Sequence, residues 1–199
     1  QKRVDRIEPQ EQRLHFEDGT SLSYETLVLA CGSIPNRLIL PGQELDGVQG
    51  FYHKKDLEQL EARTANIQTA TVVGGGLIGI ELAEMLHSRG KKVHFLVRES
   101  SFWNTVLPKE ESELINRHIR AHGIELHLAT EVKSFEADAT GNLAQVLTNK
   151  ATSLPSEWVG VAVGVSPNID FLKGSGLATG KGIFVNRFLE TNLPHIYAI

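Results

Sequence analysis

The sequence predicts an α/β fold built around a parallel sheet, and one segment supplies most of the support. Residues 71–98 read TVVGGGLIGIELAEMLHSRGKKVHFLVR. The β-branched run Thr71–Val73 is followed by a glycine-rich turn, then by apolar residues at helical spacing, and then by a second apolar run, Val93–Val97. A strand, a helix and a strand within about 30 residues form a βαβ unit, which joins parallel strands.

The turn in this unit has the spacing G-x-G-x-x-G, with Gly74, Gly76 and Gly79 at the glycine positions. The first glycine permits the tight turn, the second lets a pyrophosphate approach the backbone, and the third lets the helix pack closely on the strand. The free N–H groups and the positive dipole end of the next helix favour phosphate. The turn therefore predicts a Rossmann-like dinucleotide site. A glycine-rich turn that binds nothing is the alternative.

The helix after this turn is expected over about residues 77–89, and Gly90 is placed to end it. Its expected apolar face consists of Ile78, Leu82, Met85 and Leu86. Upstream, strands are expected at 13–16, from 21 onward and at 26–30. Residues 34–50 contain two prolines and three glycines and are expected to form a linker, which a polar helix at 54–64 follows.

Downstream of the βαβ unit, Pro108 begins a further helix and Gly123 ends it. The expected apolar face of this helix is Leu114, Ile115, His118 and Ile119. Strands are expected at 124–128, 131–137, 143–148 and 157–163, and short ones at 183–185 and 196–199. This order predicts a parallel Rossmann-like sheet from about residue 48 to 165, with strands of another kind on both sides.

Composition excludes several classes of protein. The net charge of −4, without a clustered basic tract, argues against nucleic acid as a partner. No apolar run approaches the roughly 18 residues that span a bilayer, and the polar N-terminal segment does not resemble a signal peptide. The single cysteine, Cys31, excludes an internal disulfide and a cysteine-rich metal site. We therefore expect a cytoplasmic protein.

Because the chain lacks an initial Met and stops on an apolar run, we also expect it to be a segment of a longer protein.

Four segments resemble motifs of one enzyme family. TLVLACGSIPN (residues 26–36) resembles the "ATG" segment of flavoprotein reductases that bind two dinucleotides, with Cys31 in place of the usual threonine. GGGLIGIELA resembles their NAD(P)H-binding turn, GVAVGVSPNIDFL their crossover to the FAD domain, and GIFVNRFLETNLPHIYAI the approach to a flavin motif. The four segments occur in the order and at the spacing of one family, so the chain resembles the pyridine nucleotide-disulfide oxidoreductases. Within that family it is similar in character to NADH oxidases, nitrite-reductase-like proteins, ferredoxin reductases and rubredoxin reductases.

This resemblance implies a domain organisation and a function. Residues 1–46 would be a partial FAD-domain segment and linker, residues 47–165 an inserted NAD(P)H-binding domain, and residues 166–199 the return to a truncated FAD domain. NAD(P)H would give a hydride to FAD, and the flavin would pass electrons to an unknown acceptor. The FAD-binding glycine motif would lie upstream of Gln1 and the flavin-binding Gly-Asp beyond Ile199, so the isolated segment is expected to be inactive.

The expected site follows from the motif and from the resemblance. In relatives, the glutamate two residues after the third glycine points towards the nicotinamide and flavin, which makes Glu81 the expected catalytic residue; a carboxylate that only stabilises the helix dipole is the alternative. The expected cofactor-binding residues are Gly74, Gly75, Gly76, Leu77, Ile78, Gly79, Val97, Arg98, Glu99, Gly164, Ala30 and Gly32. A carboxylate at the end of the second strand would bind a ribose hydroxyl, whereas arginine would accept a 2′-phosphate. With Arg98 beside Glu99, NADH is slightly favoured and NADPH stays open.

Other interpretations of the chain were weighed. Phe102 and Trp103 could stack on an adenine, but packing beneath their loop is favoured. His118 and His122 have the i, i+4 spacing of metal ligands, but no third ligand is evident and no metal is expected. A dehydrogenase acting directly on a carbonyl would need a lysine where Asp56 follows Tyr52. A nucleotide-sensing or interaction domain without hydride transfer is the alternative function.

Overall fold

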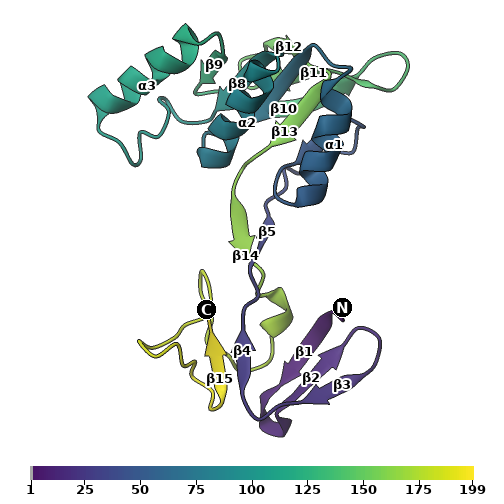
Figure 1. Ribbon diagram of the computed structural model, residues 1–199, viewed down its shortest axis with the longest axis vertical. Coiled ribbons are helices and arrows are strands. Elements are labelled where there is room, and N and C mark those ends of the chain that lie inside the picture. The colour runs from purple at the N-terminus through teal and green to yellow at the C-terminus, as the bar shows by residue number, and fades with distance from the viewer. Residues whose placement is uncertain (1) are drawn as a thin grey trace. The chain divides into compact units, whose positions relative to one another are not determined.

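The computed structural model describes residues 2–199 and divides into two compact units (Figure 1). The central unit consists of residues 35–164. The discontinuous unit combines the chain up to Ile34 with residues 165–199. No helix within residues 2–199 is long and apolar enough to cross a membrane.

The centre of the central unit is a parallel sheet, as predicted. Among the described residues it has five strands in the order β6-β13-β7-β8-β9, and every neighbouring pair is parallel. The strands are β6 (Val48–Gly50), β7 (Thr69–Val73), β8 (Lys92–Val97), β9 (Glu125–Leu128) and β13 (Trp158–Val161). Strand β13, the last of these five in the sequence, lies between β6 and β7, so the carboxyl ends of β13, β7 and β8 are neighbours.

Three helices of the described chain contribute to the core on one face of this sheet: α1 (Lys54–Thr64), α2 (Leu77–Ser88) and α3 (Lys109–Ala121). The buried residues of α2 are Gly79, Leu82, Ala83 and Leu86. They form a stripe at the spacing i, i+3, i+4 and i+7. The prediction for Ile78 was wrong, because it lies beside this stripe and is 39% exposed.

The predicted face of α3 was correct for Ile115 and Ile119, which pack in the core, but wrong for its other two residues. Leu114 is 59% exposed and His118 is exposed, whereas Ser112, Asn116 and Ile119 are buried. Hydrogen bonds explain the difference, because the Ser112 and Asn116 side chains bond to the preceding loop and thereby turn a polar stripe inward.

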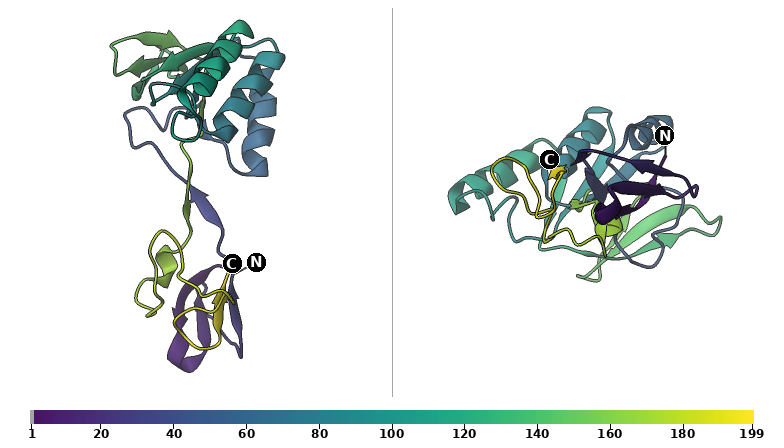
Figure 2. Two further views of the ribbon diagram at one scale, coloured as in Figure 1. Left: turned by 90° about the vertical axis from the view of Figure 1, so that its left-hand side faces the viewer. Right: turned by 90° about the horizontal axis from the view of Figure 1, so that it is seen from below.

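The opposite face of the parallel sheet is covered by an antiparallel sheet of β10 (Val132–Ala137), β11 (Leu143–Thr148) and β12 (Ser153–Pro155) (Figure 2). The strands expected at 131–137 and 143–148 therefore exist, but they do not join the parallel sheet. The expected linker at 34–50 includes parts of two strands, β5 (Ser33–Pro35) and β6. Its Leu38, Leu40 and Leu45 pack on the core beneath the antiparallel sheet.

The discontinuous unit has its own small core. An antiparallel sheet of β1 (Val4–Glu8), β2 (Arg13–Phe16) and β3 (Ser21–Ser23) includes the 3-10 turn Pro9–Glu11 between its first two strands. The strands β4 (Leu27–Leu29) and β15 (Ile196–Ala198) pair in parallel, and β5 pairs with β14 (Val165–Pro167). A second 3-10 turn, Asp170–Leu172, contributes Leu172 to the core. The predicted strand at 183–185 was wrong, because only an isolated bridge from Ile183 to Thr179 forms there.

Candidate dinucleotide-binding site

Two glycines of the G-x-G-x-x-G turn are required by the packing of the chain on itself. Gly74 has φ of +121°, and a Cβ atom there would lie 2.2 Å from the carbonyl oxygen of Ala162 at the end of β13. A Cβ atom on Gly79 would lie 1.9 Å from the carbonyl oxygen of Gly74. Both approaches are far closer than carbon and oxygen atoms tolerate, so these glycines hold the turn against β13 and against α2.

The second glycine of the motif differs. Apart from Gly76 and its two chain neighbours, no residue of the range 2–199 has an atom within 4 Å of a Cβ atom built on Gly76, which is exposed and is the N-cap of α2. The cap has no side-chain hydrogen bond, and the first turn of α2 contains no acidic residue. The helix N-terminus thus presents N–H groups and a positive dipole end without a carboxylate of its own first turn. This arrangement fits a phosphate, and the missing side chain at Gly76 leaves room for it.

A cavity of about 500 Å³ opens beside the turn, at the carboxyl ends of the parallel strands. It brings together six of the predicted residues, namely Gly74, Gly75, Gly76, Arg98, Glu99 and Gly164. A crevice beyond the carboxyl ends of the strands is the usual place for a ligand in open α/β sheets. The cavity belongs wholly to the central unit.

The end of β8 divides its residues between the core and the cavity. The Val97 side chain is fully buried and faces Gly75, where a Cβ atom would lie 2.8 Å from Val97 Cγ1. Arg98 and Glu99 line the cavity and form an ion pair, with 3.0 Å between a guanidinium nitrogen and Glu99 Oε1. The Arg98 side chain is 74% exposed, whereas that of Glu99 is 31% exposed. Val97 therefore supports the turn, and the charged pair is what a ligand would meet.

The two aromatic residues of the following loop have separate environments. Phe102 is only 4% exposed and belongs to the core under the helices, so the packing interpretation holds for it. Trp103 lines the cavity and stacks on Phe102, with ring centroids 5.7 Å apart and ring planes 2° from parallel. The indole is consequently held by a buried ring beneath it, while part of its surface adjoins the cavity.

Polar side chains of α3 fix this loop. Asn116 Oδ1 accepts a hydrogen bond of 3.0 Å from the backbone N–H of Phe102, and the Ser112 hydroxyl donates one of 2.5 Å to the Phe102 carbonyl. Asn116 is 5% exposed and Ser112 is fully buried. Because these groups satisfy both backbone groups of Phe102, the position of Trp103 depends on α3 as well as on β8.

The remaining predicted residues lie outside the cavity lining. Leu77, Ile78 and Glu81 are exposed on α2. Ala30 and Gly32 are exposed in the discontinuous unit just after β4. Gly32 has φ of +63°, and its carbonyl accepts a hydrogen bond from the backbone N–H of Asn168. Cys31, between them, is half-buried, and burial raises the pKa of its thiol.

The cavity also has lining residues that the sequence did not reveal. They are Leu38, Leu40, Val73, Leu96, Trp103, Thr105, Val106, Thr130, Glu131, Val132, Ala162 and Val163. Trp103 had been considered for adenine stacking, whereas the others had no assigned role. For Ala162 the sequence does contain a signal. It directly follows β13, and the carboxyl ends of parallel strands lie at the edge of the sheet where ligands bind. Leu38 and Leu40 come from the expected linker, and no local pattern indicated their contribution.

The predicted absence of a metal site concerned His118 and His122. Their ring centroids are 4.1 Å apart on α3, and His122 Nδ1 lies 2.9 Å from the His118 carbonyl oxygen. No third ligand joins them in the described part of the chain. A different cluster, His94, Glu125 and His127, brings three possible ligands together.

Comparison with known proteins assigns the family. The sequence matches the model of the pyridine nucleotide-disulphide oxidoreductases over residues 1–199. The chain belongs to this family. It is 32% identical over 198 residues to rhodocoxin reductase of Rhodococcus erythropolis, covering 100% of this chain and 46% of that protein. It is 32% identical over 181 residues to NADH oxidase of Lactococcus lactis, covering 89% of this chain and 40% of that protein. The chain thus spans about half or less of the relatives it matches.

Solved structures agree with the fold. Ferredoxin reductase from Rhodopseudomonas palustris superimposes with a TM-score of 0.94 at 29% identity, over 100% of this chain and 49% of that one. A water-forming NADH oxidase from Lactobacillus brevis, described as bound to NADH, has a TM-score of 0.90 at 28% identity, over 98% and 44% of the two chains. The expected α/β fold and family resemblance are both confirmed.

Proposed function

We propose that the central unit binds NAD(P)H in the cavity beside Gly76, within a protein that passes a hydride to FAD and electrons to a separate acceptor. The observation that supports this most is the unfilled space at Gly76. Gly74 and Gly79 are explained by the packing of the chain alone, whereas a Cβ atom on Gly76 would meet none of the described residues beyond its chain neighbours. A glycine is needed there if a ligand approaches the backbone.

The pyrophosphate would lie against the turn at Gly74–Gly76 and the N-terminus of α2. Backbone N–H groups and the helix dipole would offset its charge. The nicotinamide supplies the hydride chemistry, while the protein supplies orientation and electrostatics. Gly79 would act indirectly, by holding α2 close to the turn, and Val97 would act through its contact with Gly75. Leu77 and Ile78 would contribute backbone contacts at the first turn of the helix.

The ribose of the adenosine half would lie at the Arg98–Glu99 pair, and we favour NADH. Glu99 is the more sheltered member of the pair, and its carboxylate would accept hydrogen bonds from ribose hydroxyls. The same carboxylate would repel a 2′-phosphate, and it already accepts a hydrogen bond from the guanidinium of Arg98. One matched structure is described as an NADH oxidase bound to NADH, which supports the same choice. Trp103 would be the surface for the adenine ring.

The flavin half of the function is proposed from the family motifs of the chain. Ala30 and Gly32 would contribute backbone contacts to FAD, and Gly164 and Glu81 would lie towards the nicotinamide. Residues 1–46 would then be a partial FAD-domain segment and a linker, residues 47–165 the nucleotide domain, and residues 166–199 the return to the FAD domain. The acceptor is a separate redox partner, and relatives are named as reductases of ferredoxin, rubredoxin and rhodocoxin. The proposed location is the cytoplasm.

Calorimetric titration with NADH and, separately, with NADPH tests the nucleotide site. We expect NADH to bind more tightly, and Glu99→Gln to reduce that preference by about tenfold, which corresponds to ~1.4 kcal/mol. Glu84→Gln is the matched control, because Glu84 is exposed on α2 and does not line the cavity. Tighter binding of NADPH, with loss of that preference in Arg98→Ala, would assign the site to NADPH. Absence of binding by either nucleotide would contradict the proposal.

A further inference from the structure

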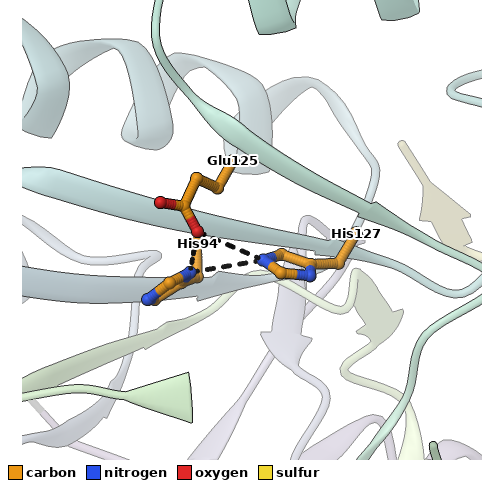
Figure 3. A group of neighbouring side chains, drawn as sticks. All are labelled: His94, Glu125 and His127. Carbon is orange, nitrogen blue, oxygen red and sulfur yellow. Dashed lines mark hydrogen bonds and ion pairs between the residues drawn. The ribbon is translucent and has the colours of Figure 1, made fainter. Parts of the chain in front are cut away.

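A second cluster of polar side chains lies on the parallel sheet, away from the cavity. His94 is near the amino end of β8, and Glu125 and His127 are on β9 (Figure 3). Strand register pairs His94 with Glu125 and Leu96 with His127, so the three side chains share the face that the antiparallel sheet covers. We propose that His94, Glu125 and His127 form a binding site for a divalent transition-metal ion such as Zn²⁺.

The distances between the donor atoms favour a metal ion. His94 Nδ1 lies 3.0 Å from Glu125 Oε2 and 3.2 Å from His127 Nε2, and the last two atoms are 4.0 Å apart. In a tetrahedral site with ligand bonds of about 2.0–2.2 Å, neighbouring ligand atoms are about 3.3–3.5 Å apart. The three donors therefore already outline one face of such a tetrahedron. Solvent would supply the fourth ligand.

Hydrogen bonding alone accounts poorly for this arrangement. His94 Nδ1 faces both a carboxylate oxygen and a ring nitrogen, but it has at most one hydrogen to donate (Figure 3). If His94 Nδ1 donates its hydrogen to Glu125, the contact with His127 has no hydrogen of its own from His94. If His127 Nε2 donates to His94 Nδ1 instead, the contact between His94 and Glu125 has none. A cation accepts a lone pair from each of the three atoms at once.

The Nε2 atom of His94 is buried near a second polar atom that has no hydrogen-bond partner among residues 2–199. His94 is 2% exposed, and its Nε2 atom has no hydrogen-bond partner among residues 2–199. Thr71, which pairs with His94 on the neighbouring strand, is fully buried, and its Oγ1 atom also has no hydrogen-bond partner in that part of the chain. A histidine that binds metal through Nδ1 has its hydrogen on Nε2 and usually donates it to a nearby oxygen. Strand register pairs Thr71 with His94, so the Thr71 hydroxyl is the candidate acceptor on the neighbouring strand, although no hydrogen bond joins the two side chains in this structure.

The surrounding charges set the strength of the site. Lys92 forms an ion pair of 3.0 Å with Glu125 Oε1 and leaves Oε2 to the cluster. The positive side chains of Lys92, Lys150 and Arg120 oppose a cation. Glu125 and His127 are partly exposed, so an ion could enter from solvent.

Titration of the metal-free protein with Co²⁺ tests the site, because tetrahedral Co²⁺ absorbs visible light and reports its ligands. We expect one Co²⁺ per chain, displaced by Zn²⁺, and a loss of affinity of about tenfold or more in His127→Gln and in Glu125→Gln. The double variant His118→Gln and His122→Gln is the matched control and should bind as the parent does. Far-UV circular dichroism checks folding, and Glu125→Gln alters the more exposed side chain if His127→Gln does not fold.

A further variant separates a metal site from a hydrogen-bonded cluster. Lys92→Gln removes a positive charge and frees Glu125 Oε1, so it should tighten Co²⁺ binding several-fold. The proposal is overturned if Co²⁺ produces no visible band in the parent protein. It is also overturned if binding survives in both Glu125→Gln and His127→Gln, or disappears in the His118 and His122 control.

Discussion

Gly79 packs directly on Gly74: a Cβ atom on Gly79 would lie 1.9 Å from the Gly74 carbonyl oxygen and 3.3 Å from the Phe95 ring. The first and third glycines of the motif are thus in contact with each other across the start of α2. A Cβ atom on Gly76, between them in the sequence, would meet none of the described residues within 4 Å beyond its chain neighbours. One motif therefore combines two glycines that the fold needs with one that only a ligand would need.

Substitution at the third glycine should damage the fold. In Gly79→Ala, the added methyl group cannot avoid a backbone oxygen, so α2 must move away from the turn. We expect a loss of about 1–3 kcal/mol in the free energy of unfolding, measured by urea denaturation. An unchanged midpoint would mean that the turn relaxes without cost.

Substitution at the second glycine should damage binding instead. Gly76→Ala adds a methyl group in open space at an ordinary φ of −90°. We expect a change in stability within about 0.5 kcal/mol of zero. The methyl group would occupy the space of a pyrophosphate, so NADH affinity measured by calorimetry should fall by about tenfold. Normal NADH binding in this variant would remove the main support for the proposed site.

Loss of the Asn116 side chain should loosen the loop that includes Trp103. Asn116→Ala leaves the buried N–H of Phe102 without its acceptor, which costs about 1–3 kcal/mol. We expect lower stability together with weaker nucleotide binding. Asn104→Ala is the control, since the Asn104 amide is exposed and bonds only to the Ser100 hydroxyl. Equal effects of the two substitutions would contradict the anchoring role.

The catalytic role proposed for Glu81 is separable from nucleotide binding. Glu81 is exposed on α2 and does not line the cavity, so Glu81→Gln should leave NADH affinity unchanged. In the whole protein with FAD, we expect flavin reduction by NADH to slow by about tenfold if Glu81 orients the nicotinamide. Stopped-flow absorbance measures this rate, and Glu84→Gln serves as the control. An unaltered rate would contradict the catalytic role and would mean that Glu81 only stabilises the dipole of α2.

The carboxyl group of Asp18, in the turn after β2, should have a lowered pKa. Hydrogen bonds from the Thr20 hydroxyl and from Lys2 lower the pKa of Asp18 from 3.8 to about 2. The folded protein therefore binds fewer protons than the unfolded chain between those values, and stability rises with pH there. This contribution is lost as the pH falls towards 2. Thr20→Val should raise the Asp18 pKa towards 3.8 by NMR titration, while Asp138, which Thr140 stabilises similarly, stays unchanged.

Local sequence was sufficient for the elements with strong periodicity. The helix over 54–64 and the two strands of the βαβ unit, β7 and β8, were predicted because apolar spacing and turn residues agree there. The face of α3 was partly mispredicted because hydrogen bonds to Phe102 bury Ser112 and Asn116, and hydrophobicity does not register such bonds. Within the site, the glycines and the charged pair at 98–99 were accessible from the motif, whereas Leu38, Leu40 and Thr130 were not.

The sequence by itself determined the βαβ unit and its glycine-rich turn, and it indicated the family through four short motifs, because each of these depends on residues that are near one another in the chain. The tertiary structure decided which side chains face the cavity and brought His94 beside Glu125 and His127. Those arrangements depend on the order and register of strands that are distant in the sequence. The pairing of β8 with β9 and the insertion of β13 beside β7 fix them. No local pattern specifies such pairing, since it is selected by the packing of both faces of the sheet.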